Sequence, residues 1–266
     1  MEVLECIRKR RAIKYYTDKP VPDDILEKIL EAGRWAPGAA GFSAFEFLVV
    51  RNEESRRKIL ELAYEVAMIT GSISSTWCRH IGIDKTQRAH HAPGEAFYST
   101  GGGLSEKTRP EQHWKAPVYV IVVADQDKRE THVYHTGCFG WEHILSAACA
   151  IQNMWLAAYS LGVGATWLTF YDPVRIQYMF GIPSALDVVG IVLLGYPPEW
   201  PEEPTGRFCG TRGIYPRRPL EDMVHYEKYD MEKRRKFLEI DPFISWLSYE
   251  ERKRRVKEGG GIWPDD

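Results

Sequence analysis

The chain has 266 residues, and its 35 lysines and arginines nearly balance its 37 aspartates and glutamates, for a formal net charge of −2. That balance argues against a general nucleic-acid-binding protein, which needs a surplus of cations to neutralise phosphates. Hydrophobic residues make up 44% of the chain, enough for a sizeable core, yet no apolar run approaches the roughly 20 residues of a membrane span. The five cysteines are scattered and never spaced C-x-x-C, so we expect no disulfide framework and a soluble, cytoplasmic protein.

The first 70 residues carry alternating helix and strand signals. Apolar residues at helical spacing predict a short helix over 2–11 and a second helix that begins near Pro22, a residue suited to a first helical turn. The run Ala36-Pro37-Gly38 ends the second helix, and the apolar run 45–50 predicts a strand. Asn52 is a favoured N-cap residue, so we expect a third helix directly after it.

Between residues 71 and 115 neither a helical nor a strand period persists. A stretch of that length inside a compact domain is usually a functional lid or a disordered segment. Its many aromatic residues favour a lid, because disordered segments are poor in aromatics. We therefore expect a lid that orders over a ligand, with His90 and His91 as candidates to contact a substrate once it closes.

Regular structure returns with the apolar run 118–123, which predicts a buried strand. Residues 137–161 are small and apolar around most of a helical circumference, so we expect a central helix buried on several sides and stopped by Gly162. The charge-rich tail from residue 225 predicts helices lying on a surface rather than a second core. Between these segments we expect a strand over 165–170, a helix over 173–180 and a strand over 188–196.

Cations gather where the first predicted helix ends. Arg10 and Arg11 offer guanidinium forks that suit a phosphate, and Lys14 suits an electron-rich heteroatom edge. On charge alone, the alternative of a solvated helix terminus that merely complements the helix dipole is favoured. A second candidate is the small-residue loop 36–43, whose backbone could approach a planar ligand closely, or which is an ordinary connection.

Histidine and cysteine also occur in groups whose ligand types suit zinc. No C-x-x-C or H-E-x-x-H accompanies them, and a bare H-x-x-H recurs by chance, so we expect no metal. A Rossmann fingerprint, a nucleophile elbow and a P-loop are also absent from the sequence. The residues weighed as ligands are His132, His135, Cys138 and His143 in one group, and Cys78, His80, His90 and His91 in the other.

Taken in order, several motifs resemble the nitroreductase-type FMN flavoprotein family. The resemblance spans about residues 4–70 and 116–225; each motif is weak alone, but the ordered set is specific. The family's opening "I-x-x-R-R-S-x-R" is represented by Ile7, Arg10, Arg11, Ala12 and Lys14, and its "V-x-x-x-x-L-x-x-I-L-x-A-x-x-A-P-S" by residues 21–38. The later motifs are "Q-N-x-x-L-A-A-x-x-L-G-L-G" at 152–164, "G-I-P" at 181–183, "G-Y-P" at 195–197 and "R-R-P-L" at 217–220.

This resemblance implies an α+β fold with an antiparallel-rich sheet flanked by helices, working as an intertwined homodimer with FMN at the interface. It implies one FMN-binding domain over 1–225 with a lid insertion at about 71–115, followed by a charged extension over 226–266. By the family pattern, Arg10 and Arg11 hold the phosphate or ribityl region, Ala12 adds backbone contacts, and Lys14 lies near the pyrimidine edge of the flavin. The other implied residues are Pro37, Gly38 and Ala39 from the second subunit, Thr166, Trp167 and Leu168 beside the ring, Arg217 at the phosphate, and Ala40 and Gly41 bordering the substrate.

The activity that the resemblance implies is transfer of hydride from NADH or NADPH, through flavin N5, to an aromatic or conjugated acceptor. The flavin carries this chemistry, so no catalytic protein nucleophile is expected. Alternatives are a reductive dehalogenase or a flavin-consuming member of the same family, and a non-catalytic flavin-binding protein. Ala12, Gly38 and Gly41 stand where the family usually has serine, serine and asparagine, which predicts fewer side-chain contacts to the flavin ring and bears most on the identity of the acceptor.

Overall fold

The structure is a computed structural model that describes residues 2–38, 43–80, 113–125, 142–200, 208–209, 215–216 and 220–231. The chain divides into two compact units, one formed by Met1–Ile69 with Leu104–Trp200 and the other by Thr70–Gly103 with Pro201–Asp266. The predicted domain over 1–225 with its lid and extension stays a prediction, because most of the lid and of the extension lies outside the described residues.

A four-stranded sheet forms the centre of the first unit. Its strands lie in the order β1-β2-β4-β3, and every neighbouring pair is antiparallel. The predicted α+β fold with an antiparallel sheet is therefore confirmed. The strands are β1 (Phe45–Val50), β2 (Val118–Asp125), β3 (Gly164–Leu168) and β4 (Leu186–Gly195).

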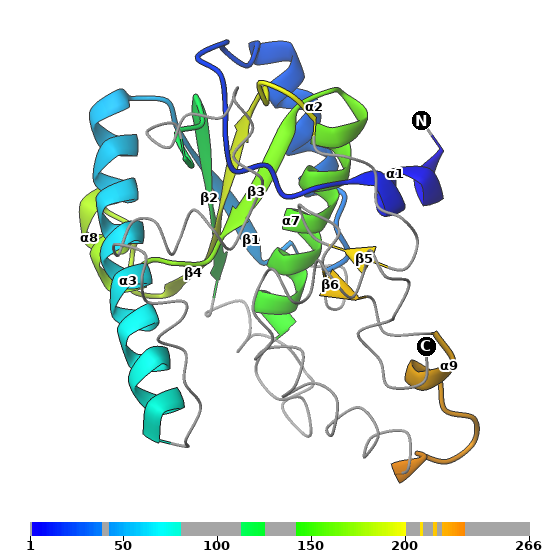
Figure 1. The fold of residues 1–266 in the computed structure, drawn as a ribbon. Coiled ribbons are helices and arrows are strands. Elements are labelled where there is room, and N and C mark those ends of the chain that lie inside the picture. Colours follow the sequence, from blue (N-terminus) through cyan, green and yellow to red (C-terminus); the bar gives the residue numbers. More distant parts are fainter. Residues whose placement is uncertain are drawn as a thin grey trace. The chain divides into compact units, whose positions relative to one another are not determined.

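Helices cover both faces of this sheet (Figure 1). Helices α2 (Asp23–Arg34) and α7 (Glu142–Ser160) pack together on one face, and α3 (Glu53–His80) begins on the other face, beside α8 (Pro173–Phe180). Because successive side chains of a strand alternate between faces, Val118, Val120 and Val122 join the core beneath α2 and α7, while Tyr119 and Ile121 point to the α3 side. Both faces of β2 are buried from Val118 to Ala124, which explains why this part of the strand carries no charged residue.

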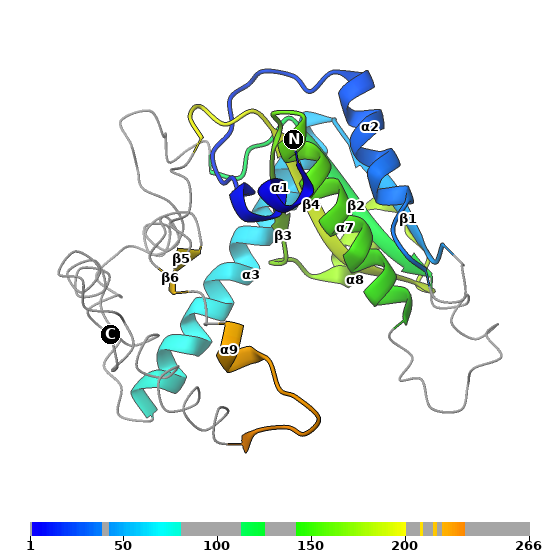
Figure 2. The ribbon, with the colours of Figure 1, turned by 90° about the vertical axis from the view of Figure 1, so that its right-hand side faces the viewer.

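The short helix α1 (Val3–Lys9) packs against α7, as Figure 2 shows. Cys6 is the buried residue of α1, and its thiol donates to the carbonyl of Leu156 on α7, at 3.3 Å. Val3, Leu4 and Ile7 on the same helix stay exposed. Helix α1 is therefore fixed to the first unit by its inner side, while its apolar outer side is left uncovered by the residues that the structure describes.

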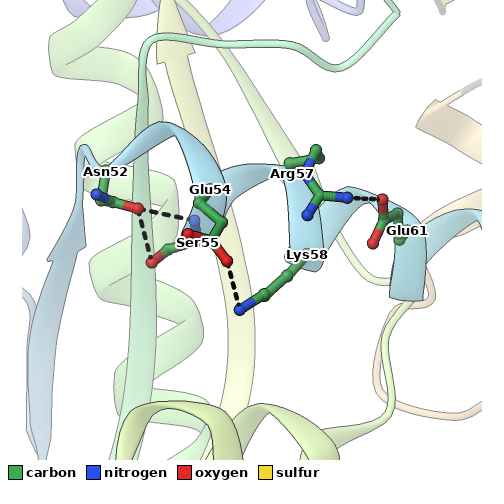
Figure 3. Close-up of polar contacts among 6 residues, drawn as sticks. All are labelled: Asn52, Glu54, Ser55, Arg57, Lys58 and Glu61. Atoms are coloured by element: carbon green, nitrogen blue, oxygen red, sulfur yellow. Dashed lines mark hydrogen bonds and ion pairs between the residues drawn. The ribbon is translucent and has the colours of Figure 1, made fainter.

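Helix ends follow the signals in the sequence. The Asn52 side-chain oxygen accepts from the backbone N–H of Ser55 at 3.0 Å and from its hydroxyl at 3.2 Å (Figure 3), which confirms the predicted cap. Gly162 takes a left-handed φ of 74° directly beyond α7, as the stop signal predicts. Helix α3, in contrast, continues to His80, beyond the point near residue 71 where the helical period fades. Adding residues to an existing helix costs far less than starting one, so weak helix formers can extend it.

The second unit contributes few described elements. Strand β5 (Phe208–Cys209) pairs antiparallel with β6 (Tyr215–Pro216), and α9 (Leu220–Met223) follows. The predicted tail helices fall almost entirely outside the described residues. Among the described residues, no helix combines the length and the apolar character needed to cross a membrane.

Candidate functional site

The predicted cationic segment forms a strap, residues 10–17, across one end of the sheet. The Ile13 N–H donates to the carbonyl of Ala165 on β3 at 3.0 Å, and the Thr166 hydroxyl donates back to the Ile13 carbonyl. The strap ends where the Thr17 N–H donates to the Tyr196 carbonyl, at 2.8 Å. These bonds bring the predicted residues 10–14 and 166–168, which are more than 150 positions apart in the chain, to the same edge of the sheet.

The two arginines of the strap have different surroundings. Arg10 is half-buried, and its guanidinium carbon lies 3.9 Å from the centre of the Trp155 indole ring on α7. Arg11 is only 6% exposed, and its Nη1 donates to the carbonyls of Arg8 and Arg10 at 3.4 and 3.1 Å. Arg11 thus satisfies carbonyls that the end of α1 leaves without helical partners, whereas Arg10 rests on an aromatic surface.

Lys14 is held by a strained turn that precedes β2. The backbone N–H of Trp114 donates to the Lys14 carbonyl at 2.6 Å, and Tyr15 forms a β-bridge with His113. Trp114 has a φ of +59°, a conformation that bulky residues rarely adopt and that surrounding structure must enforce. The enforcing contacts include the Tyr119 hydroxyl, which donates to the Trp114 carbonyl at 2.8 Å.

Aromatic rings enclose this turn. His113 is 1% exposed and lies between rings, with centroids 4.3 Å from Trp114 and 5.4 Å from Tyr15. The Tyr64 hydroxyl donates to the His113 carbonyl at 2.8 Å. Burial, reinforced by the positive charge of Lys14, lowers the pKa of His113 to about 3. His113 is therefore neutral at neutral pH, and it adds no second positive charge beside the Lys14 ammonium.

The β3 residues predicted to flank the flavin ring are largely buried. Thr166 and Leu168 are buried and Trp167 is half-buried. The Trp167 indole lies directly against the backbone of Gly190 on β4, because a Cβ atom placed there would come within 2.0 Å of the indole nitrogen. That nitrogen is buried and has no hydrogen-bond partner among the described residues. Gly190 therefore sets the position of the Trp167 ring by leaving room for it.

Strand β1, which follows the loop after α2, begins at the opposite end of the sheet from the strap. The strap meets β3 at Ala165. Ala165 lies opposite Leu194 of β4, and Leu194 lies opposite Val118, the first residue of β2. The chain that follows the loop enters β1 at Phe45, opposite Ala124 near the end of β2. Six residues of β-strand separate the two ends, roughly 20 Å at about 3.3 Å per residue.

The predicted residues Ala39, Ala40, Gly41, His90, His91 and Arg217 lie outside the described residues, whereas Pro37 and Gly38 directly follow α2.

One histidine of the groups weighed as metal ligands is described as part of the core. His143, on α7, is 3% exposed, and its Nε2 lies 2.8 Å from Asp187 Oδ2 on β4. Its predicted companions His132, His135 and Cys138 lie outside the described residues. Within the described part of the chain, no three candidate metal ligands come together.

Sequence reasoning missed the residues that support the strap. Trp155 occupies a variable position of the "Q-N-x-x-L" motif, so only its place in an apolar helix was evident. His113 and Trp114 fall at the edge of the stretch without a period, and Tyr64 is one of many residues on α3. The one available signal was aromatic residues immediately before an apolar strand.

Comparison with known proteins places this arrangement in a family. The model of the Nitroreductase family matches residues 7–196. A protein of Methanothermobacter thermautotrophicus with the provisional name NADH dehydrogenase/NAD(P)H nitroreductase is 29% identical over 233 residues, 86% of this chain and 88% of that protein. Iodotyrosine deiodinase 1 of Rattus norvegicus is 31% identical over 202 residues, 74% of this chain and 62% of that protein. An FMN-dependent nitroreductase of Clostridium difficile shares the fold, with a TM-score of 0.51 and 21% identity over 85% of this chain and 99% of that one.

Proposed function

This chain belongs to the nitroreductase family and is a flavin-type oxidoreductase, and from that premise we propose a more specific activity. The protein binds FMN, accepts hydride from NADH or NADPH, and reduces an aromatic or conjugated acceptor. The observation that carries the proposal is the strap, because its backbone at Ala12 and Ile13, between the predicted cations, bonds to the β3 segment predicted to flank the flavin ring.

The residues of this end of the sheet fit a phosphorylated flavin. Arg10 lies over an aromatic ring, and a guanidinium is the group that best matches the geometry of a phosphate dianion. Lys14 is half-buried, so its charge acts where solvent screening is weaker than at the surface. The donor set of guanidinium, ammonium and backbone therefore matches the phosphate and the electron-rich ring edge of FMN.

In the proposed site, each group has a defined task. Arg10 binds the phosphate, with Arg217 as a further contact by the family pattern. Lys14 lies near the pyrimidine edge and stabilises the negative charge that reduction builds there, which favours the reduced cofactor. Neutral His113 and the strained Trp114 turn hold the Lys14 backbone in place. Bound FMN supplies the hydride-transfer chemistry itself.

We propose that two copies of the chain complete the site. The strap and the loop after α2 join one chain's sheet at opposite ends, so Pro37, Gly38 and Ala39 of a second copy would line the ring. Ala40 and Gly41 of that copy would border the substrate. The uncovered apolar residues Val3, Leu4 and Ile7 on α1, together with exposed Leu145 on α7, support pairing of this kind.

A second candidate reaction is reductive removal of halogen from an aromatic ring. It is favoured by the 31% identity to a relative named iodotyrosine deiodinase 1. In that case the same flavin site would serve, and the acceptor would be a halogenated phenol. A third possibility, a flavin-binding protein without turnover, would keep the strap but show no reaction with nicotinamide nucleotides.

One set of measurements tests these proposals. The ligand released by heating the purified protein should be FMN, and anaerobic addition of NADH or NADPH should bleach the yellow absorption of the protein. Nitroaromatic, quinone and iodophenol acceptors, added singly, should identify the compound that restores the colour. Bound flavin that stays yellow with both nucleotides would contradict the enzymatic proposal, and a protein that neither contains nor takes up FMN would contradict the flavin site.

A further inference from the structure

We propose that Trp155 is a positioning residue that presents Arg10 of the strap to the phosphate of the flavin nucleotide. This inference rests on the proposed FMN site and adds to it a residue on a different element, α7. It is carried by two independent contacts that one indole ring makes with consecutive residues of the strap.

The first contact is with Arg10. Its guanidinium carbon lies 3.9 Å from the centre of the Trp155 ring, within the range of a cation–π interaction, for which tryptophan is the best partner. A cation–π contact is an attraction between the positive charge and the face of the ring, and it does not require a hydrogen bond from the guanidinium N–H groups. The ring therefore restricts the side chain of Arg10 without using the donors that a phosphate needs.

The second contact is with the backbone of Arg11. The indole Nε1–H donates to the Arg11 carbonyl at 3.2 Å. This bond fixes the chain just before the Ala12 bridge to Ala165, which anchors the strap to β3. One side chain thus sets both the rotamer of Arg10 and the path of the backbone that carries it.

The position does not require tryptophan for packing alone. Trp155 is half-buried, whereas the inner face of α7 is formed by fully buried aliphatic residues such as Ile151 and Met154. An aliphatic residue could cover the same apolar surface, but it could neither stack under a cation nor donate to a carbonyl. Tryptophan at this position holds the Arg10 side chain in place before the phosphate binds, which reduces the entropy lost when Arg10 is ordered on binding.

The experiment compares the affinities of FMN and riboflavin, which differ only in the phosphate. Apoprotein variants are titrated with each flavin, and the ratio of the two dissociation constants reports the phosphate contribution. Trp155→Leu removes both contacts and should lower the FMN preference about 5- to 30-fold, while riboflavin affinity stays within about 2-fold. Trp155→Phe keeps a ring under Arg10 and loses the indole N–H, so it should lower the preference by a smaller factor, about 2- to 5-fold.

Two control variants separate this role from general effects. Lys19→Ala removes a different cation stacked on a ring, 4.1 Å from Tyr196, and Trp200→Leu removes an aromatic that packs edge-on against Tyr159 of α7. Both should leave the FMN preference unchanged. Arg10→Ala should lose the preference as Trp155→Leu does, and the double variant should lose little more, because the two residues act on the same phosphate contact.

The outcomes distinguish the inference from its premise. Equal loss of both flavins in Trp155→Leu would show a structural role and overturn the inference. An unchanged ratio in that variant would overturn it as well, and so would fully additive losses in the double variant. If the wild-type protein binds neither flavin, the proposed function itself fails.

Discussion

The two faces of the sheet are built in different ways. Beneath α2 and α7 the core is apolar and close-packed, formed by valines, alanines, Ile151 and Met154. On the α3 side, buried or half-buried tyrosine hydroxyls donate to backbone carbonyls that lie outside regular structure. Tyr16 donates to Ile13 at 2.7 Å, Tyr64 to His113 at 2.8 Å, and Tyr119 to Trp114 at 2.8 Å.

Because of this difference, one face of the sheet mainly contributes to the stability of the fold, and the other mainly fixes the shape of the flavin site. Apolar packing has no direction and tolerates small shifts, whereas a hydrogen bond to a carbonyl fixes where that atom lies. The carbonyls fixed on the α3 side belong to the strap and to the turn that holds it. We therefore expect substitutions of the fully buried apolar residues beneath α2 and α7 to lower stability most, and substitutions of the α3-side hydroxyls to alter the flavin site at a smaller cost in stability.

The largest expected effect is on the apolar face. Met154 is fully buried, so Met154→Ala should lower the free energy of unfolding by about 2–5 kcal/mol through lost burial and a cavity. Chemical denaturation measures this loss. At temperatures where the variant stays folded, its FMN affinity should match that of the wild type. A large loss of FMN affinity in Met154→Ala without a loss of stability would contradict the view that this face of the sheet mainly contributes stability.

The next effect is a dependence of stability on pH that originates on the α3 side. Because the pKa of His113 is lowered to about 3 in the folded protein from 6.5, the unfolded chain binds more protons between those values. The free energy of unfolding should therefore fall as the pH is lowered from 6.5 toward 3, at up to about 1.4 kcal/mol per pH unit from this residue. His113→Gln removes the titrating group, so the difference between wild type and variant should shrink on acidification. A constant difference between pH 7 and pH 4.5 would contradict the burial of a neutral histidine.

The sequence predicted elements better than it predicted the connections between them. The strands at 45–50 and 118–123 follow from apolar runs, and the start of α3 follows from the cap at Asn52, since those signals are local. The juxtaposition of residues 10–14 with β3 came from a family resemblance, because a parallel bridge between Ala12 and Ala165 has no local signature. The Trp114 turn was missed because no glycine or asparagine marks its positive φ. That conformation is imposed by tertiary contacts, which a single sequence does not show.

A single hydroxyl tests whether the α3 side shapes the site. Burial raises the pKa of Tyr119, so its hydroxyl stays protonated and donates to the Trp114 carbonyl. Tyr119→Phe leaves that carbonyl without its donor and should cost about 1–2 kcal/mol of stability. It should also relax the turn that fixes Lys14, which would lower the reduction potential of bound flavin. Phe47→Leu, on β1 against the opposite core, is the control, since it should lower stability without moving the potential.

The smallest effect is expected at the start of α3, where the capping residue is exposed. Asn52→Ala removes the acceptor for the Ser55 N–H (Figure 3) and should lower the free energy of unfolding by about 1 kcal/mol. Ser55→Ala is the matched control, because it removes only the hydroxyl that also bonds to Asn52 and leaves the backbone bond intact. Neither variant should alter flavin affinity or potential, since the cap holds a helix end and not the strap. Equal weakening of flavin binding by Asn52→Ala and Tyr119→Phe would contradict this view. It would mean that any loss of stability on the α3 side reaches the flavin site, and that specific hydrogen bonds do not explain the shape of that site.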